Sequence, residues 1–112
     1  MKPLVLILAL LAGSGLVSLP LRAADLAQGK LKAQQACQTC HGLNGLSPMA
    51  GVPVLSGQKE EYMIAQLQAF RTSQRQHAQM SIIAQGLSDA DIENVANWYA
   101  SIKVSVELPA MQ

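Results

Sequence analysis

The spacing of apolar and small residues along the chain predicts helices. These residues recur about every 3.6 positions, which places them on one helix face, in segments that cover residues 25–36, 59–71 and 88–102. A shorter helical turn is expected to follow Met80 and to end at Gly86, because glycine commonly ends helices. No stretch of useful length alternates between apolar and polar residues, as a half-buried strand would. The fold class is therefore predicted to be all-α.

Individual residues mark where two of these helices begin. Asp25 can accept hydrogen bonds from the free backbone N–H groups at the start of the first helix. Ser88 and Asp91 have the spacing of a capping box at the start of the last helix, with Asp in place of Glu. Gly29 and Ala33 lie one turn apart and form a face of small residues. We therefore expect another helix to approach the first one closely there.

Residues 1–23 have the features of a secretory signal peptide. Lys2 gives a positive start, and residues 4–12 form a continuous apolar run. The run is short for a membrane span, and Gly, Ser and Pro interrupt the apolar residues after position 12. Cleavage is expected near Ala23 or Ala24, and a retained N-terminal anchor is the alternative. The sequence therefore predicts an exported, periplasmic protein that contacts a membrane only if this segment is retained.

Removal of residues 1–23 changes the charge and the size of the protein. The whole chain has a net charge of +1, but two basic residues leave with this segment, so the remainder carries about −1. No basic stripe occurs, which argues against a nucleic-acid partner. One small domain is expected over residues 24–103. Residues 104–112 are expected to be a tail, because Pro109 prevents a helix there.

The run Cys37-Gln38-Thr39-Cys40-His41 carries the clearest chemistry in the chain. C-x-x-C-H is typical of c-type haem attachment: each thiol can form a thioether to one vinyl group of the porphyrin, and the histidine can bind the iron. Cys37 and Cys40 are the chain's two cysteines. A disulfide is the alternative outside the cytoplasm. A thioredoxin-like site would need a βαβ context, and a zinc site would need more ligands. The sequence therefore predicts one covalently attached haem with His41 as an iron ligand.

A second residue is needed to bind the iron opposite His41. Met80 is a lone apolar side chain after a polar loop, and it stands 39 residues beyond His41, which leaves enough chain to wrap the haem. His77 is the runner-up and would give a bis-histidine haem. The other methionines after residue 23 are less suited. Met63 is expected to pack in the core, Met49 has only a short connection to His41, and Met111 lies in the tail.

The loop over residues 42–57 is expected to orient His41. A proline carbonyl in this loop could accept a hydrogen bond from the ring nitrogen of His41 that does not bind the iron, which would fix the imidazole and raise its basicity. Pro48 and Pro53 are both candidates for this acceptor.

Several stretches together resemble a known family. The chain from Asp25 to Ile102 resembles a class I cytochrome c of the small bacterial type, and it is similar to cytochrome c553 and to one half of the dihaem cytochrome c4. The matching stretches are Gly29-Lys30, Cys37-x-x-Cys40-His41-Gly42, Pro53-Val54-Leu55-Ser56-Gly57-Gln58, Tyr62-x-x-x-Gln66-Leu67, Arg75 to Met80, Leu87-Ser88-Asp89-x-Asp91-Ile92 and Trp98-Tyr99-Ala100-Ser101.

The resemblance implies an all-α cytochrome c fold, in which three main helices and a short turn wrap one covalently bound haem. The first and last helices would cross, so that Gly29 meets the face formed by Val95 and Trp98. The family places the thioethers on the two cysteines, Cys37 and Cys40, and the axial iron ligands on His41 and Met80. His77 stands where relatives commonly have a polar, non-ligating residue.

These features predict an exported single-haem electron carrier that is not itself an enzyme. The iron would cycle between Fe(II) and Fe(III), and redox partner proteins would dock transiently over a small, weakly polar interface. Docking is expected to depend little on salt because the surface carries little charge. Two alternatives stay open: a haem-based sensory or ligand-binding protein whose distal ligand is labile, and an electron-transfer subunit of a periplasmic oxidoreductase.

Overall fold

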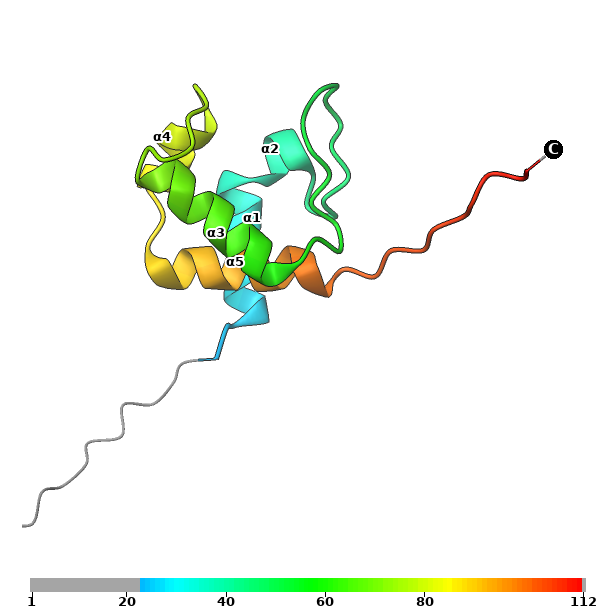
Figure 1. Cartoon of the computed structure of the whole chain (residues 1–112). Helices are drawn as coiled ribbons and strands as arrows, with labels where there is room; N and C mark the ends of the chain where they lie inside the picture. The colour runs from blue at the N-terminus through cyan, green and yellow to red at the C-terminus, as the bar shows by residue number, and fades with distance from the viewer. Residues whose placement is uncertain (1–22, 112) are drawn as a thin grey trace, which may run out of the picture.

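The computed structural model describes residues 23–111, and the regular structure within them is entirely helical. Three helices are long, α1 (Leu26–Ala36), α3 (Glu60–Arg71) and α5 (Asp89–Ser101), and two are short, α2 (Gln38–His41) and α4 (Met80–Gln85) (Figure 1). The all-α prediction is confirmed. The three long helices match the segments predicted from the apolar spacing to within one or two residues at each end.

The predicted helix caps are present. The Asp25 side chain accepts hydrogen bonds from the backbone N–H groups of Ala27 and Gln28 at the start of α1. Ser88 and Asp91 form a complete capping box at the start of α5, since each side chain bonds the backbone N–H of the other. These bonds satisfy N–H groups that have no partner inside a helix.

The short helix α2 is the main difference from the sequence prediction. The first helix was expected to end at Ala36, and it does, but the chain turns at Cys37 and continues as α2. Cys37 links the two helices directly: its N–H donates to Ala33 O of α1, and its carbonyl oxygen accepts from the N–H of His41. Four residues are too few to show a helical spacing, so periodicity could not reveal α2.

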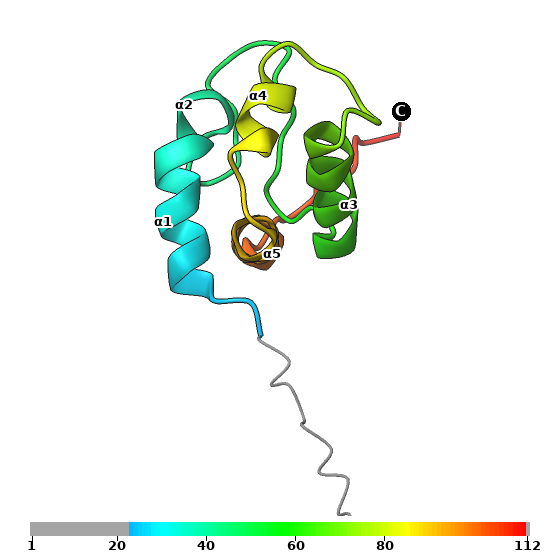
Figure 2. The ribbon, with the colours of Figure 1, turned by 90° about the vertical axis from the view of Figure 1, so that its left-hand side faces the viewer.

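Helix α5 lies between the other two long helices. In a view along α5, α1 lies on one side and α3 on the other, and α2 and α4 are both at the same end of the molecule (Figure 2). α5 packs against both α1 and α3. The α1 contact is close, because a Cβ atom added to Gly29 would collide with the backbone of Asn94 and with Cβ of Trp98. The predicted crossing at Gly29 is confirmed, with Asn94 rather than Val95 as its closest neighbour.

The protein core lies where these helices meet. Met63 of α3 is buried there, as its position on the helix stripe predicted. The other buried members come from α1 and α5: Ala33, Val95, Ala96 and Tyr99. Tyr99 and Ile92 are the largest side chains that are fully buried. A core of this size is small, and a small domain commonly needs a further source of stability.

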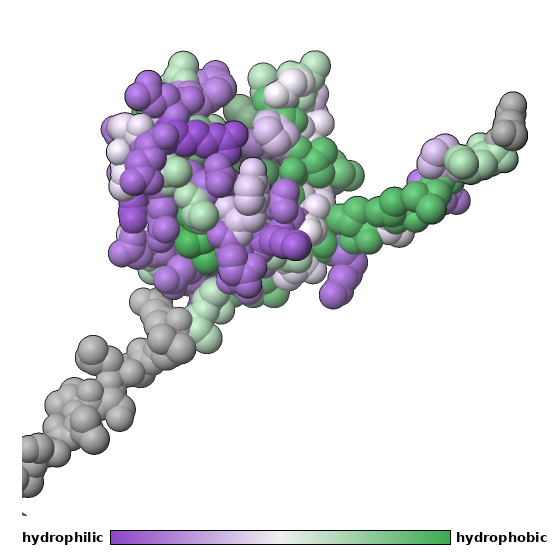
Figure 3. Space-filling model, in the orientation of Figure 1, coloured by the Kyte–Doolittle hydropathy of each residue, from purple (hydrophilic) through white to green (hydrophobic). Residues whose placement is uncertain are grey.

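The segment after α5 has no regular structure and leads away from the helices (Figure 1). Apolar side chains form a large part of its surface in the space-filling view (Figure 3). Val106 and Leu108 lie in it and are exposed, and Met111 is 96% exposed.

Candidate haem site

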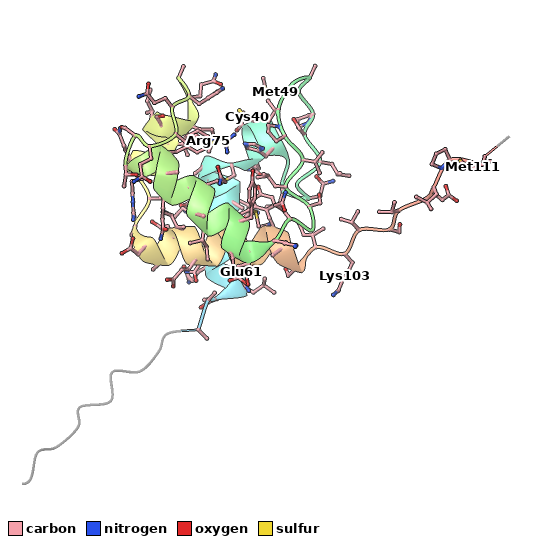
Figure 4. All side chains as sticks on the ribbon, viewed as in Figure 1. Cys40, Met49, Glu61, Arg75, Lys103 and Met111 are labelled. Atoms are coloured by element: carbon pink, nitrogen blue, oxygen red, sulfur yellow. The ribbon has the colours of Figure 1, made fainter. Side chains whose placement is uncertain are left out.

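The helical turn of α2 brings together the three residues of the C-x-x-C-H motif. Cys37 precedes α2, and Cys40 and His41 lie within it. Both thiols are free and half-buried, and His41 is buried, with 8% of its surface exposed. Figure 4 shows Cys40 on the side of α2 that faces α4. One short turn therefore supplies two thiols and an imidazole at a single place.

A hydrogen bond to the loop over residues 42–57 orients the imidazole of His41. Its Nδ1 lies 2.9 Å from the carbonyl oxygen of Pro53. A carbonyl oxygen only accepts hydrogen bonds, so Nδ1 must carry the hydrogen, and in the neutral ring Nε2 keeps a free lone pair. Hydrogen bonds of this kind, made by the ring nitrogen that does not bind the metal, orient metal-binding histidines. The structure thus selects Pro53, not Pro48, as the acceptor.

Two residues of α5 hold the chain immediately after His41. The Tyr99 hydroxyl donates to the carbonyl oxygen of Gly42, and Trp98 Nε1 donates to that of Leu43, each at 3.0 Å. Burial raises the pKa of Tyr99, and the nearby Cys37 raises it further, so the phenol stays protonated and remains a donor. Gly42 itself needs to be glycine: its φ is +76°, and a Cβ would lie 2.5 Å from Leu46 O.

The sequence interpretation missed this pair of bonds. Both residues fall within the last predicted helix, over residues 88–102, and the sequence pattern does not indicate a polar role for either. Both acceptors are backbone carbonyls, which have no signature in the sequence. The presence of two adjacent aromatic residues with polar groups on a packed face was the one available signal, because buried Tyr and Trp usually find a hydrogen-bond partner.

The thiol of Cys37 lies in a partly buried, apolar environment. Burial raises its pKa to about 11, although the charge of Lys32 acts in the opposite direction. Cys37 also packs against the core cluster of the protein. Its sulfur is therefore neutral and directed into the structure, as suits an atom that anchors a buried group rather than a redox-active thiolate.

Met80 is the first residue of α4 and is half-buried. The remaining methionines lie in other environments: Met63 is in the core, while Met49 and Met111 are exposed. His77 is exposed, and its Nδ1 accepts hydrogen bonds from the backbone N–H groups of Gln79 and Met80. Met80 begins α4, and α4 lies at the same end of the molecule as α2 (Figures 1 and 2).

The packing of the helices leaves α2 and α4 apart. Among the described helices, α2 packs mainly on α1, and α4 packs on α3. In the space-filling view the outline is notched between the α4 side and the loop over residues 42–57 (Figure 3). A group held by α2 would therefore face α4 across this gap.

A model of the cytochrome c family matches residues 26–103. The chain belongs to the cytochrome c family. It is 39% identical over 82 residues to cytochrome c-554(548) of Halomonas halodenitrificans, a match that covers 70% of this chain and 98% of the relative. It is 38% identical over 101 residues to cytochrome c4 of Pseudomonas aeruginosa, a match that covers 90% of this chain and 50% of the relative.

Solved cytochromes show the same fold. The crystal structure of reduced cytochrome c4 from Pseudomonas stutzeri superposes with a TM-score of 0.67 at 34% identity, and the match covers 75% of this chain and 48% of that one. The chain thus spans about half the length of the cytochrome c4 proteins it matches.

Haem c, attached covalently, is the cofactor of this cytochrome c, and the residues at α2 fit it. Two thiols, and an imidazole whose Nε2 is free, form the donor set that thioether attachment and iron binding need. Within residues 23–111 no group of three or more His, Cys, Asp or Glu residues could hold a metal ion without a haem. The two thiols and the free Nε2 therefore fit a covalently attached haem.

None of the helices in the described part of the chain has the length and apolar character that crossing a bilayer requires. The signal-peptide prediction falls almost wholly on residues 1–22, outside the described residues, and it stays a prediction.

Proposed function

We propose that this cytochrome c is an exported, periplasmic electron carrier with one haem. In this proposal Cys37 and Cys40 form the thioethers, His41 is the proximal iron ligand and Met80 is the distal ligand. One observation carries the proposal: the bond from His41 Nδ1 to Pro53 O leaves Nε2 free for iron. The position of Met80 on α4, at the same end of the molecule as α2, supports the distal assignment.

The bound haem supplies an iron that takes up and releases one electron. The residues of the chain decide what else that iron can do. His41 and Met80 together would fill both axial positions, so no position would remain for a substrate or a gas. A methionine opposite a histidine also raises the reduction potential. We therefore infer a carrier rather than an enzyme.

The loop over residues 42–57 is the proposed docking surface for redox partners. It contains His41's acceptor, Pro53, and it exposes three apolar side chains: Leu46, Met49 and Val54. No charged residue occurs between positions 33 and 58. Docking there would bury a small apolar area and would be transient.

Carbon monoxide tests whether the distal position is closed. Optical spectra of the haem-loaded, reduced protein are recorded with and without carbon monoxide. The carrier proposal expects no change in wild-type protein, whereas Met80→Ala should bind carbon monoxide readily. Met49→Ala is the matched control, because Met49 is an exposed methionine in the loop, and it should behave as wild type. Ready binding by wild-type protein would instead support the ligand-binding or sensory alternative.

A further inference from the structure

His77 lies on a loop that α3 and α4 hold in place. The Phe70 ring anchors it. The Arg75 guanidinium carbon lies 4.6 Å from the centre of this ring, and the His77 ring packs against it in a T-shaped arrangement with the ring centres 6.5 Å apart. Arg75 Nη1 also donates to Gln66 Oε1. The loop between α3 and α4, which the sequence showed only as a polar stretch, is therefore an ordered connection to Met80.

His77 makes reciprocal bonds with the first turn of α4. Its backbone N–H donates to Ser81 Oγ at 3.1 Å, and its backbone carbonyl accepts from the N–H of Ser81 at 3.0 Å. Its ring Nδ1 accepts from the N–H groups of Gln79 and Met80, each at 3.3 Å. These N–H groups lie at the start of a helix, where the helix itself offers no acceptor.

The partners of Nδ1 fix the tautomer of His77. A backbone N–H only donates, so Nδ1 must be an unprotonated acceptor, and in the neutral ring the hydrogen lies on Nε2. An Nε2 that carries hydrogen has no lone pair for iron. His41 shows the opposite arrangement, since its Nδ1 faces a carbonyl oxygen and its Nε2 is free. In these tautomers Nε2 of His41 is free to bind iron, whereas Nε2 of His77 carries a hydrogen and is not.

We propose that His77 is a positioning residue that caps α4 and thereby sets the place of Met80, and that it is not an iron ligand. The proposal rests on the proposed function, because it takes Met80 as the distal ligand. Binding of iron through Nε2 of a neutral His77 would require the hydrogen to move to Nδ1, which would then face two N–H donors. In the observed geometry, the neutral His77 ring therefore cannot accept these N–H groups at Nδ1 and bind iron through Nε2 at the same time.

Three variants of the haem-loaded protein test the proposal. His77→Ala removes the acceptor, and we expect the fraction of reduced protein that binds carbon monoxide to rise on the order of tenfold, as typical cap losses would give. The long-wavelength absorption band of the Met-ligated ferric haem should weaken in parallel. His77→Asn should restore both signals, because an Asn side-chain oxygen can also accept hydrogen bonds from backbone N–H groups two and three positions further on. Gln76→Ala, an exposed neighbour in the same loop, should resemble wild type.

Each way in which these proposals could fail gives a different pattern of carbon monoxide binding among the variants. If His77→Ala keeps a closed iron while Met80→Ala opens it, the positioning role is wrong and the carrier proposal stands. If His77→Ala opens the iron fully, Asn does not rescue it and Met80→Ala stays closed, His77 is the ligand. If wild-type protein already binds carbon monoxide, the proposed function fails and the role of His77 fails with it. Far-UV circular dichroism checks that each variant keeps its helices.

Discussion

The backbone of Asn94 lies so close to Gly29 that a Cβ atom added to the glycine would come within 2.0 Å of the Asn94 carbonyl oxygen. The obstructing atoms belong to the main chain of α5, so no side-chain movement relieves the contact. Asn94 also ties the start of α1 to α5, since its Oδ1 accepts from the backbone N–H of Asp25 at 2.7 Å. The crossing of α1 and α5 thus depends on the absence of a side chain at Gly29 and on the side-chain amide of Asn94.

Gly29→Ala is expected to lower the free energy of unfolding by about 1–3 kcal/mol, as overpacking commonly does. This loss would occur although alanine favours a helix over glycine by about 1 kcal/mol. Denaturant unfolding of the haem-loaded protein measures it. Gln28→Ala on the exposed face of α1 is the control and should keep or raise stability. Equal stability of Gly29→Ala and wild type would contradict the close crossing.

Tyr99→Phe removes the hydroxyl that donates to Gly42 O while keeping the buried ring. We expect a loss of about 1–2 kcal/mol in unfolding free energy, because the carbonyl of Gly42 loses its partner in a part-buried place. Tyr62→Phe is the matched control, since Tyr62 is 50% exposed. Thermal or denaturant unfolding compares the two variants. A similar small effect of both would show that the bond from α5 contributes nothing.

Asp91 makes the stability depend on pH. Its partial burial acts to raise the pKa, but hydrogen bonds from Ser88 and the Lys32 charge outweigh it and hold the pKa below the ordinary value of 3.8. A carboxylate whose folded pKa is depressed stabilises the fold above its unfolded pKa, and this contribution disappears as pH falls through the folded pKa. Asp91→Asn should therefore be less stable than wild type at neutral pH.

The difference between Asp91→Asn and wild type should shrink as pH falls below the ordinary aspartate range. Unfolding free energies at several pH values measure it, and the difference between variants cancels the titration of groups that both share. Glu93→Gln, which changes an exposed carboxylate on the same helix, serves as the control. A gap that stays constant from neutral to acid pH is the result that would count against the role of Asp91.

Docking through the loop over residues 42–57 should depend little on salt. Electron self-exchange between oxidised and reduced protein, followed by NMR, uses a second copy as the probe partner. Between about 0.01 M and 1 M salt the screening length falls from about 30 Å to about 3 Å, yet we expect the rate to change less than about threefold. A change of orders of magnitude would defeat the prediction.

A charge placed on the loop over residues 42–57 should make the rate of electron self-exchange depend on salt. Leu46 is 56% exposed, so Leu46→Lys puts two like charges at the contact between copies and should slow self-exchange most at low salt. Leu108→Lys adds the same charge to the exposed tail and should leave the rate unchanged. If both variants behave alike, the loop is not the docking surface.

The sequence predicted the long helices and their caps because these are local properties. Apolar spacing and the residues Asp25, Ser88 and Asp91 act within a few positions of one another, so one sequence contains the whole signal. The C-x-x-C-H motif is local in the same sense, so the sequence alone predicts haem attachment there.

Relationships between distant segments were not predictable in this way. The choice of Pro53 over Pro48, and the bonds from Trp98 and Tyr99 to the chain after His41, involve backbone carbonyls that any residue could supply. His77 presented the same difficulty. Its residue type allowed an iron ligand or a solvated side chain, and only the position of Nδ1 against two N–H groups indicates a cap.

The crossing of α1 and α5 also sets an order of events in time. Asp25 and Asn94, which meet at this crossing, are 69 positions apart. A growing chain therefore cannot close the crossing before its last helix has been made, and contacts between distant segments form slowly. Tyr99 and Trp98, which hold the chain after His41, arrive with the same helix. Until α5 packs in place, these hydrogen bonds do not hold the chain after His41, so the haem site is complete only once the last helix has joined the fold.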